Sequence, residues 1–146
     1  MMRLLAFFLA TFVLTGCGSQ QAGYEIDGSN KHALSLTRTQ DYPGSDWKNY
    51  LVVSRFPECQ RRYRLGDTGD SYKMDVYRAQ PGVFILNQSK HWYVTETQTC
   101  RWQEYPEPPA EPGELVGTFQ TKADELAWVD KEAKKENATG RAPAVK

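Results

Sequence analysis

The run Val83-Phe84-Ile85-Leu86 is the strongest indication of the fold, because it is the most apolar stretch after residue 17 and has no polar side. Short apolar runs that contain β-branched and aromatic residues and are bounded by turn residues are typical of buried strands. The run is preceded by Gln80-Pro81-Gly82 and followed by Asn87-Gln88-Ser89-Lys90, both of which are turn-forming clusters. We therefore expect it at the centre of an antiparallel sheet, with residues 91–97 as its hairpin partner.

The chain on either side of this run consists of further short segments with β character, separated by turn signals roughly every 8–12 residues. These segments are Ala33–Arg38, Asn49–Phe56, Cys59–Leu65, Tyr72–Arg78 and Leu115–Phe119. Such spacing predicts a mainly β (α+β) domain, an antiparallel meander curled into a small sandwich or an open barrel.

The C-terminal region shows helical rather than alternating periodicity. Thr121 is a suitable N-cap, and Asp124 stands where a capping box places its acid. An apolar stripe would then be formed by Leu126, Val129 and Ala133. We expect one helix over residues 122–137 that closes the domain, followed by a disordered tail over residues 138–146.

The N-terminal region has the features of an export signal: one basic residue, Arg3, then an apolar run from Leu4 to Leu14. The run is shorter than the ~20 residues of a membrane span. Its end, Leu14-Thr15-Gly16-Cys17, resembles the lipobox of bacterial lipoprotein precursors. The resemblance implies that residues 1–16 are removed and that Cys17 carries a diacylglycerol, often with a further acyl chain such as palmitate. The alternative is a plain secreted protein in which Cys17 is a coincidence.

The resemblance covers only the first 17 residues, and no family is evident for the rest of the chain. In the enterobacterial lipoprotein pattern an Asp after the lipidated Cys retains the protein in the inner membrane. Here Gly18 follows, which favours the outer membrane, with the protein facing the periplasm. Residues 17–30 are small and polar, so we expect a flexible tether there and a single domain over residues 31–137.

The charge balance and the cysteine content limit which partners and which disulfide we expect. Removal of residues 1–16 takes away Arg3 and leaves 17 basic and 18 acidic residues, which gives no reason to expect nucleic acid as a partner. With Cys17 committed to lipid, Cys59 and Cys100 remain in an oxidising compartment, where a disulfide is the default. The alternative is two separate buried thiols.

A Cys59–Cys100 bond would bring together two charged groups of opposite sign. Arginines lie around Cys59, at Arg55, Arg61, Arg62 and Arg64, whereas Glu104, Glu107 and Glu111 follow Cys100. These groups could simply neutralise one another. Alternatively, Arg61, Arg62 and Arg64 could bind a partner that bears carboxylates or phosphates, such as peptidoglycan.

The aromatic residues suggest a second kind of binding surface. Tyrosine and tryptophan are favoured at binding surfaces, and Trp92 with Tyr93 is the pair that we single out. The competing interpretation is that these rings fill the core of a small β domain.

Catalytic and metal-binding patterns are weak. Asp67-Thr68-Gly69 repeats the triplet of aspartic proteases, but it has no second copy and suits a solvated turn better. Only His32 and His91 are available as imidazoles, and we expect no metal ion or cofactor.

We therefore expect a non-enzymatic interaction or structural module, anchored through lipid on Cys17, whose partner is an envelope protein or peptidoglycan. The alternatives are an inhibitor of a cell-wall hydrolase, similar in general form to the small lysozyme-inhibitor lipoproteins, and an unrecognised hydrolase.

Overall fold

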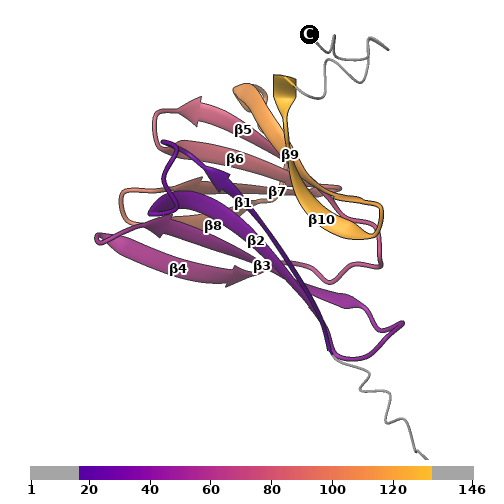
Figure 1. The fold of residues 1–146 in the computed structure, drawn as a ribbon. Helices are drawn as coiled ribbons and strands as arrows, with labels where there is room; N and C mark the ends of the chain where they lie inside the picture. The colour runs from indigo at the N-terminus through magenta and orange to yellow at the C-terminus, as the bar shows by residue number, and fades with distance from the viewer. Residues whose placement is uncertain (1–16, 133–146) are drawn as a thin grey trace, which may run out of the picture.

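We describe the protein from a computed structural model, which describes residues 17–132 (Figure 1). The predicted signal peptide, residues 1–16, and the predicted tail, residues 138–146, lie outside the described residues. The strands are β1 (Gly18–Glu25), β2 (His32–Gln40), β3 (Trp47–Arg55), β4 (Cys59–Arg64), β5 (Lys73–Gln80), β6 (Val83–Gln88), β7 (His91–Glu96), β8 (Arg101–Tyr105), β9 (Glu114–Lys122) and β10 (Glu125–Asp130).

These strands form two antiparallel sheets. Sheet A has four strands in the order β1-β2-β3-β4, and sheet B has six in the order β10-β9-β5-β6-β7-β8. Within residues 17–132 no named strand of one sheet pairs with a named strand of the other, so the sheets do not close into a barrel and form a small sandwich. The prediction of a mainly β antiparallel domain is confirmed.

The core lies between the inner faces of the two sheets. Sheet A contributes alternating residues of β2 and β3, including Leu34, Leu36 and Leu51, each fully buried. Strand β6 lies between β5 and β7, as its apolar sequence predicts, and directs Phe84 and Leu86 into the core. The central position of this run is therefore confirmed.

The two long sides of the sandwich are closed in different ways. On one side β4 faces β8; the Cys59–Cys100 disulfide and the stacked rings of Tyr63 and Trp102 join them, and we call this side the disulfide seam. On the other side β1 runs alongside β10, where Tyr24 stacks on Trp128 with ring centroids 4.6 Å apart; we call this side the aromatic seam.

The predicted tether over residues 17–30 is wrong for Gly18–Glu25, which form β1 and pair with β2 from Gly18↔Gln40 to Glu25↔Ala33. Alternate residues of β1 face inward: Gly18, Gln20, Ala22 and Tyr24. Three of these four residues are small or polar, so hydrophobic and polar residues do not alternate along the strand as they usually do. The folded domain therefore begins at residue 18, not at residue 31.

The predicted helix over residues 122–137 is also wrong, because its first part forms the β9–β10 hairpin. Ala123 and Asp124 make the two-residue turn and both have positive φ, 46° and 64°. Such turns match the twist of paired strands but usually carry Asn-Gly or Asp-Gly, so the sequence gives no hairpin signal. Residues 133–137 of the predicted helix lie outside the described residues.

Candidate functional site

The predicted lipidation residue lies at the surface, at the very start of the sandwich. Cys17 is an exposed free cysteine, and its Sγ lies 3.6 Å from the backbone oxygen of Asp41 in the loop between β2 and β3. Figure 1 shows β1 beginning at the end of the molecule where this loop lies, whereas β10 finishes at the opposite end. The next residue, Gly18, packs inward, since a Cβ there would lie 3.0 Å from the Trp47 side chain.

The loop beside Cys17 presents an unusual surface. Tyr42 is 65% exposed, one of two large hydrophobic side chains that the described chain exposes. Next to it, the ammonium of Lys48 lies 2.6 Å from the Asp41 carboxylate. We call Cys17, Asp41, Tyr42 and Lys48 the Cys17 end.

The predicted disulfide is present. Cys59 opens β4, Cys100 lies just ahead of β8, and their Cα atoms are 6.0 Å apart, well within bonding range. The Tyr63 hydroxyl also donates a hydrogen bond to the backbone oxygen of Cys100. The disulfide seam therefore combines a covalent bond with polar and aromatic contacts.

The charge groups that this bond was expected to bring together find other partners. Arg64 pairs with Asp67 at 2.7 Å, and Glu104 pairs with His91 at 2.9 Å. Within residues 17–132 no ion pair joins Arg61, Arg62 or Arg64 to Glu104, Glu107 or Glu111. The mutual neutralisation considered from the sequence is thus not what this structure contains.

The three arginines of β4 do not share one face, because the strand alternates. Arg62 and Arg64 lie on the outer face, where their guanidinium carbons stand 3.7 and 5.2 Å from the ring centroid of Tyr50. Arg61 has the opposite orientation and lines a hollow with Trp102. A single partner could therefore engage Arg62 and Arg64 together but not all three.

Trp92 and Tyr93 likewise point to opposite faces of β7. Trp92 stacks on Tyr77 on the outer face of sheet B, at 6.1 Å between centroids. Tyr93 is 5% exposed and stacks against Trp102 at 4.5 Å. Burial raises the pKa of Tyr93 to about 12, with a further contribution from Glu104. Tyr93 belongs to the core, which leaves Trp92 as the ring that a partner could reach.

The Asp67-Thr68-Gly69 segment is fixed by a residue that the sequence analysis did not single out, Arg38. This side chain is fully buried, and all five of its N–H donors are used. The acceptors are Asn49 Oδ1, Gln20 Oε1, Asp70 O, Thr68 Oγ1 and Gly69 O, at 2.6–3.4 Å. Burial lowers the pKa of Arg38, and Tyr72 and the Asp70 carboxylate partly oppose that shift.

Arg38 gives this segment a structural role. Gly69 O, the Thr68 hydroxyl and the neighbouring Asp70 O serve as hydrogen-bond acceptors for a buried cation that has no ion pair within residues 17–132. Asp67 is turned outward to Arg64. The predicted solvated turn is wrong in form, because β4 and β5 belong to different sheets and the segment crosses between them, with Thr68 bridged to Trp47.

A chain of acid, imidazole and hydroxyl occurs elsewhere, and it resembles the relay of a hydrolase. Asp27 Oδ2 lies 3.5 Å from His32 Nδ1, and His32 Nε2 lies 2.9 Å from Thr97 Oγ1. Thr97 is completely buried, so its hydroxyl has no access to a substrate. The chain instead ties the β1–β2 turn of sheet A to the β7–β8 turn of sheet B.

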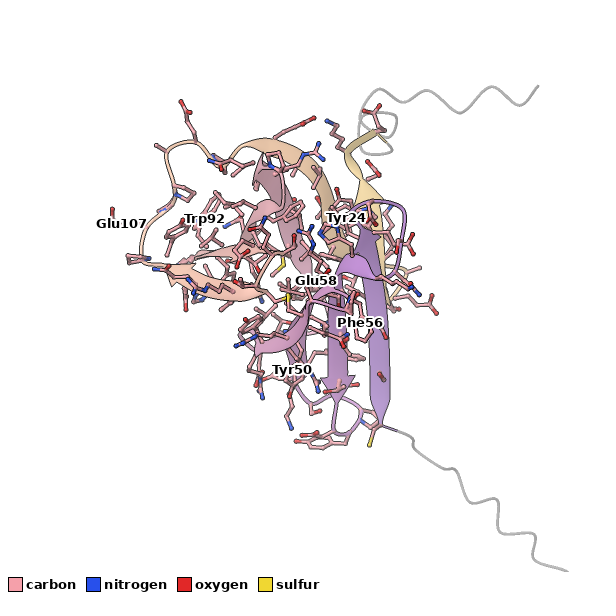
Figure 2. The ribbon with its side chains drawn as sticks, turned by 90° about the vertical axis from the view of Figure 1, so that its left-hand side faces the viewer. Tyr24, Tyr50, Phe56, Glu58, Trp92 and Glu107 are labelled. Atoms are coloured by element: carbon pink, nitrogen blue, oxygen red, sulfur yellow. A yellow bond between two sulfur atoms is a disulfide. The ribbon has the colours of Figure 1, made fainter. Side chains whose placement is uncertain are left out.

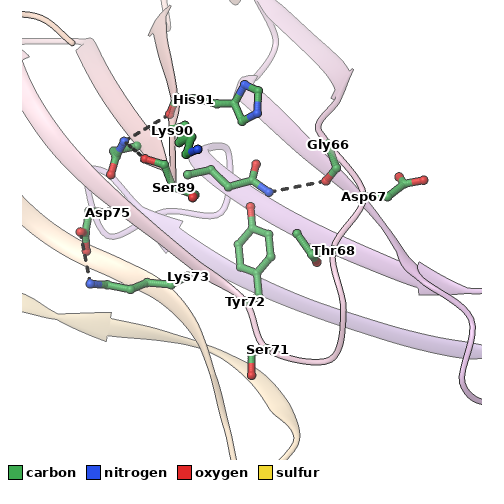
Figure 3. A pocket seen from close by; sticks show the side chains of 12 residues that line it. Gly66, Asp67, Thr68, Ser71, Tyr72, Lys73, Asp75, Ser89, Lys90 and His91 are labelled. Carbon is green, nitrogen blue, oxygen red and sulfur yellow. Dashed lines mark hydrogen bonds and ion pairs between the residues drawn. The ribbon is translucent and has the colours of Figure 1, made fainter. Parts of the chain in front are cut away.

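One hollow lies between the Gly66–Tyr72 segment and the turn that joins β6 to β7, and Figure 3 shows it. It contains Ser71, Ser89 and His91, the residue types of a hydrolase. His91 Nδ1 bonds Glu104, but within residues 17–132 no serine hydroxyl bonds either histidine. This geometry does not assemble a nucleophile with its base.

Two further searches bear on function. Among residues 17–132 no group of three or more His, Cys, Asp or Glu side chains is placed to hold a metal ion. In the same part of the chain no helix is long and apolar enough to cross a membrane. Comparison with known protein families, curated proteins and solved structures finds no match.

Proposed function

We propose that this chain is a bacterial lipoprotein, anchored through lipid on Cys17 to the outer membrane and facing the periplasm, whose β sandwich is a non-enzymatic interaction module. The observation that carries the proposal is the exposed Cys17, which follows the lipobox-like residues and stands one residue ahead of β1. Two or three acyl chains on one residue hold a protein on a bilayer essentially permanently.

Because β1 starts at Gly18, the lipid is joined to the sandwich without a linker. The Cys17 end would then rest on the lipid headgroups, where tyrosine is favoured and where Tyr42 is already exposed. The remaining surface, including Trp92 and the Arg62–Tyr50–Arg64 group, would stay accessible to an envelope protein or to peptidoglycan.

The test is metabolic labelling of the natural host with an alkyne analogue of palmitate. We expect label on the wild-type protein and recovery in the outer-membrane fraction after an alkaline carbonate wash. Cys17→Ala should abolish both, whereas Ser19→Ala, which leaves the lipobox-like residues intact, should change neither. An unlabelled wild-type protein, released by the wash, would overturn the proposal.

Partner capture separates anchoring from recognition. Crosslinking in intact cells is compared between the wild-type protein and an exported Cys17→Ala form. A partner captured by both forms would show that Cys17 sets only the location. A partner captured only by the anchored form would make the lipid part of recognition.

A second candidate function, inhibition of a cell-wall hydrolase, is favoured by the loop between β8 and β9. Figure 2 shows Glu107 on a stretch that extends away from both sheets. Prolines 106, 108, 109 and 112 restrict this loop, and Glu107 and Glu111 make it acidic. Lysozyme, a basic protein, is the natural probe: inhibition should slow its lysis of bacterial cells and be weakened by Glu107→Lys. An unchanged rate of lysis would eliminate this candidate.

A further inference from the structure

The hollow beside the β6–β7 turn, which we call the Gln88 pocket, has the size of a small-molecule site. Its volume is 610 Å³, within the roughly 300–1,000 Å³ of such pockets. One wall is the Gly66–Tyr72 segment and the other is formed by the end of β6 and the turn after it. In Figure 3 the Tyr72 ring lies between the stretch with Gly66 and Thr68 and the turn with Ser89 and Lys90, and Ser71 lies below it.

Gln88 supplies the observation that points to a ligand. Its side chain lines the pocket although the residue is only 6% exposed. Its Nε2 donates to the backbone oxygen of Gly66 at 3.5 Å, the dashed line that ends at Gly66 in Figure 3. Its Oε1 is buried and accepts no hydrogen bond, the one such side-chain atom among the described residues.

A buried carbonyl without a hydrogen bond destabilises the fold, and an apolar residue at position 88 would avoid this cost. Gln88 continues the inward-facing series of Phe84 and Leu86, where an apolar side chain would fit the core without penalty. Because Oε1 has almost no accessible surface in this structure, the amide must turn towards the pocket before a bound molecule can reach it; a hydrogen-bond donor of that molecule would then satisfy the Oε1 atom and remove the penalty. The group is therefore placed as a recognition element rather than as a packing element.

The rest of the lining indicates what kind of molecule this is. The Ser71 and Ser89 hydroxyls and the Lys90 ammonium make no hydrogen bond to another residue of the described chain. Lys73 pairs with Asp75 at 3.7 Å and Asp67 pairs with Arg64, so Lys90 is the one lining ammonium without an ion pair among the described residues, and a single such charge selects a strong anion only weakly. Many uncommitted polar groups with little net charge suit a ligand whose hydroxyls both donate and accept.

The wall that faces Gln88 is held in place before any ligand arrives. Gly66 O also accepts from Asn49 Nδ2 at 2.8 Å, and the following residues are fixed by the buried Arg38. A preformed wall reduces the ordering that binding would otherwise require.

We propose that the Gln88 pocket binds a short saccharide, with a hydroxyl or acetamido N–H donating to Gln88 Oε1. The inference goes beyond the proposed function and does not depend on lipid at Cys17.

The experiment measures binding of two uncharged oligosaccharides, the N-acetylglucosamine tetramer and maltotetraose, to the full-length protein purified in detergent. Saturation-transfer NMR and calorimetry give the dissociation constants. Binding of both probes identifies a hydroxyl as the donor to Gln88, whereas binding of the first alone identifies the acetamido N–H. Binding of neither probe overturns the proposal.

A matched pair of variants locates the site. Gln88→Met keeps the side-chain length but removes the carbonyl, so it should weaken binding by roughly tenfold while the melting temperature stays equal or rises. Gln60→Met makes the same chemical change on exposed β4, where the amide bonds Ser54, and should leave binding unchanged. Equal binding by the Gln88 variant would overturn the assignment, as would a crystal structure, soaked with either probe, in which only a water contacts Oε1.

A second variant keeps the proposal testable if Gln88→Met does not fold. Ser71→Val alters the opposite wall, and we expect weaker binding with an unchanged circular dichroism spectrum. Cys17→Ala should bind both saccharides as the wild type does, so failure of the lipid proposal and failure of this one are separate results.

Discussion

Along the disulfide seam the two sheets are joined by a covalent bond, whereas along the aromatic seam they are held by non-covalent contacts. The first combines Cys59–Cys100 with a stack in which Trp102 lies between Tyr63 and Tyr93. The second relies on Trp128, which contacts Tyr24 and Phe119, and on a hydrogen bond from Gln20 Nε2 to Asp124 O. The aromatic seam is also the one that continues into Cys17. The part of the fold that a lipid would pull on is therefore its non-covalent side.

The largest expected effect is removal of the covalent bond. The double variant Cys59→Ala, Cys100→Ala opens a loop of 41 residues, which in the chain-entropy model lowers the free energy of unfolding by about 4 kcal/mol. Urea unfolding of the variant and the wild type measures it. Reduced wild-type protein serves as the control and should unfold at nearly the same urea concentration as the variant. A loss below about 1 kcal/mol would mean that the disulfide seam is held mainly by its rings.

Truncation of the central ring of the aromatic seam should lower the free energy of unfolding by less than loss of the disulfide does. Trp128→Ala removes the stacking contact with Tyr24 and the edge-to-face contact with Phe119 from a half-buried side chain, for an expected loss of about 2–3 kcal/mol. Trp92→Ala is the matched control, because Trp92 is also half-buried and stacked but lies outside both seams; about 1 kcal/mol is expected there. Equal losses for the two variants would contradict a special role for Trp128 in closing the sandwich.

A smaller effect is expected from adding one methyl group to the aromatic seam. A Cβ at Gly117 would collide with the Trp128 ring and lie 2.7 Å from Val129 O, so Gly117→Ala should cost about 1–2 kcal/mol. Gly23→Ala on β1 is the control, since its Cβ would meet only Ser35 Oγ at 3.6 Å and should be neutral. Thermal unfolding of both variants makes the comparison. A stable Gly117→Ala protein would show that Trp128 is free to move.

The smallest expected effect is a loss of stability at alkaline pH, and it involves one tyrosine from each seam. Burial raises the pKa of Tyr93 to about 12 and raises that of Tyr24 above its ordinary value. The unfolded chain loses these protons near pH 10, where the native state keeps them. The stability that depends on the protonated rings is complete below about pH 10 and is lost as pH rises towards 12. Tyrosinate absorbance and the urea midpoint of unfolding are measured against pH. Ionisation of every tyrosine near pH 10 in the native protein would contradict this prediction.

The sequence predicts the disulfide seam because cysteine pairing has a compositional signal, and it fails at the aromatic seam because that seam has none. Both errors in the fold, the tether and the helix, concern the strands β1 and β10 that meet there. In β1 the inward positions are mostly small or polar, so strand periodicity is hidden. In β10 the spacing of Leu126 and Val129 favours a helix, because residues three apart share a helix face but lie on opposite faces of a strand.

The candidate sites show the same limit. The residue type of Cys17, Cys59 and Cys100 already suggests their roles. Arg38 and Gln88, in contrast, cannot be told from other polar residues near the end of a strand. A signal exists in both cases: Arg38 continues the inward alternation of Leu34 and Leu36, as Gln88 does for its own strand. A polar residue in the register of buried ones is a candidate for a buried hydrogen-bonding role, even where hydropathy marks the end of the strand.

The central claim of this account is that Cys17 is joined to a folded strand and not to a tether. Hydrogen exchange of the β1 amides in the acylated protein, reconstituted in lipid vesicles, tests it most directly. We predict that the amides of Gly18–Glu25 that pair with β2 exchange at least roughly tenfold more slowly than those of an unstructured peptide. Exchange of the whole segment at the unstructured rate would contradict the claim and support the flexible tether that the sequence predicts.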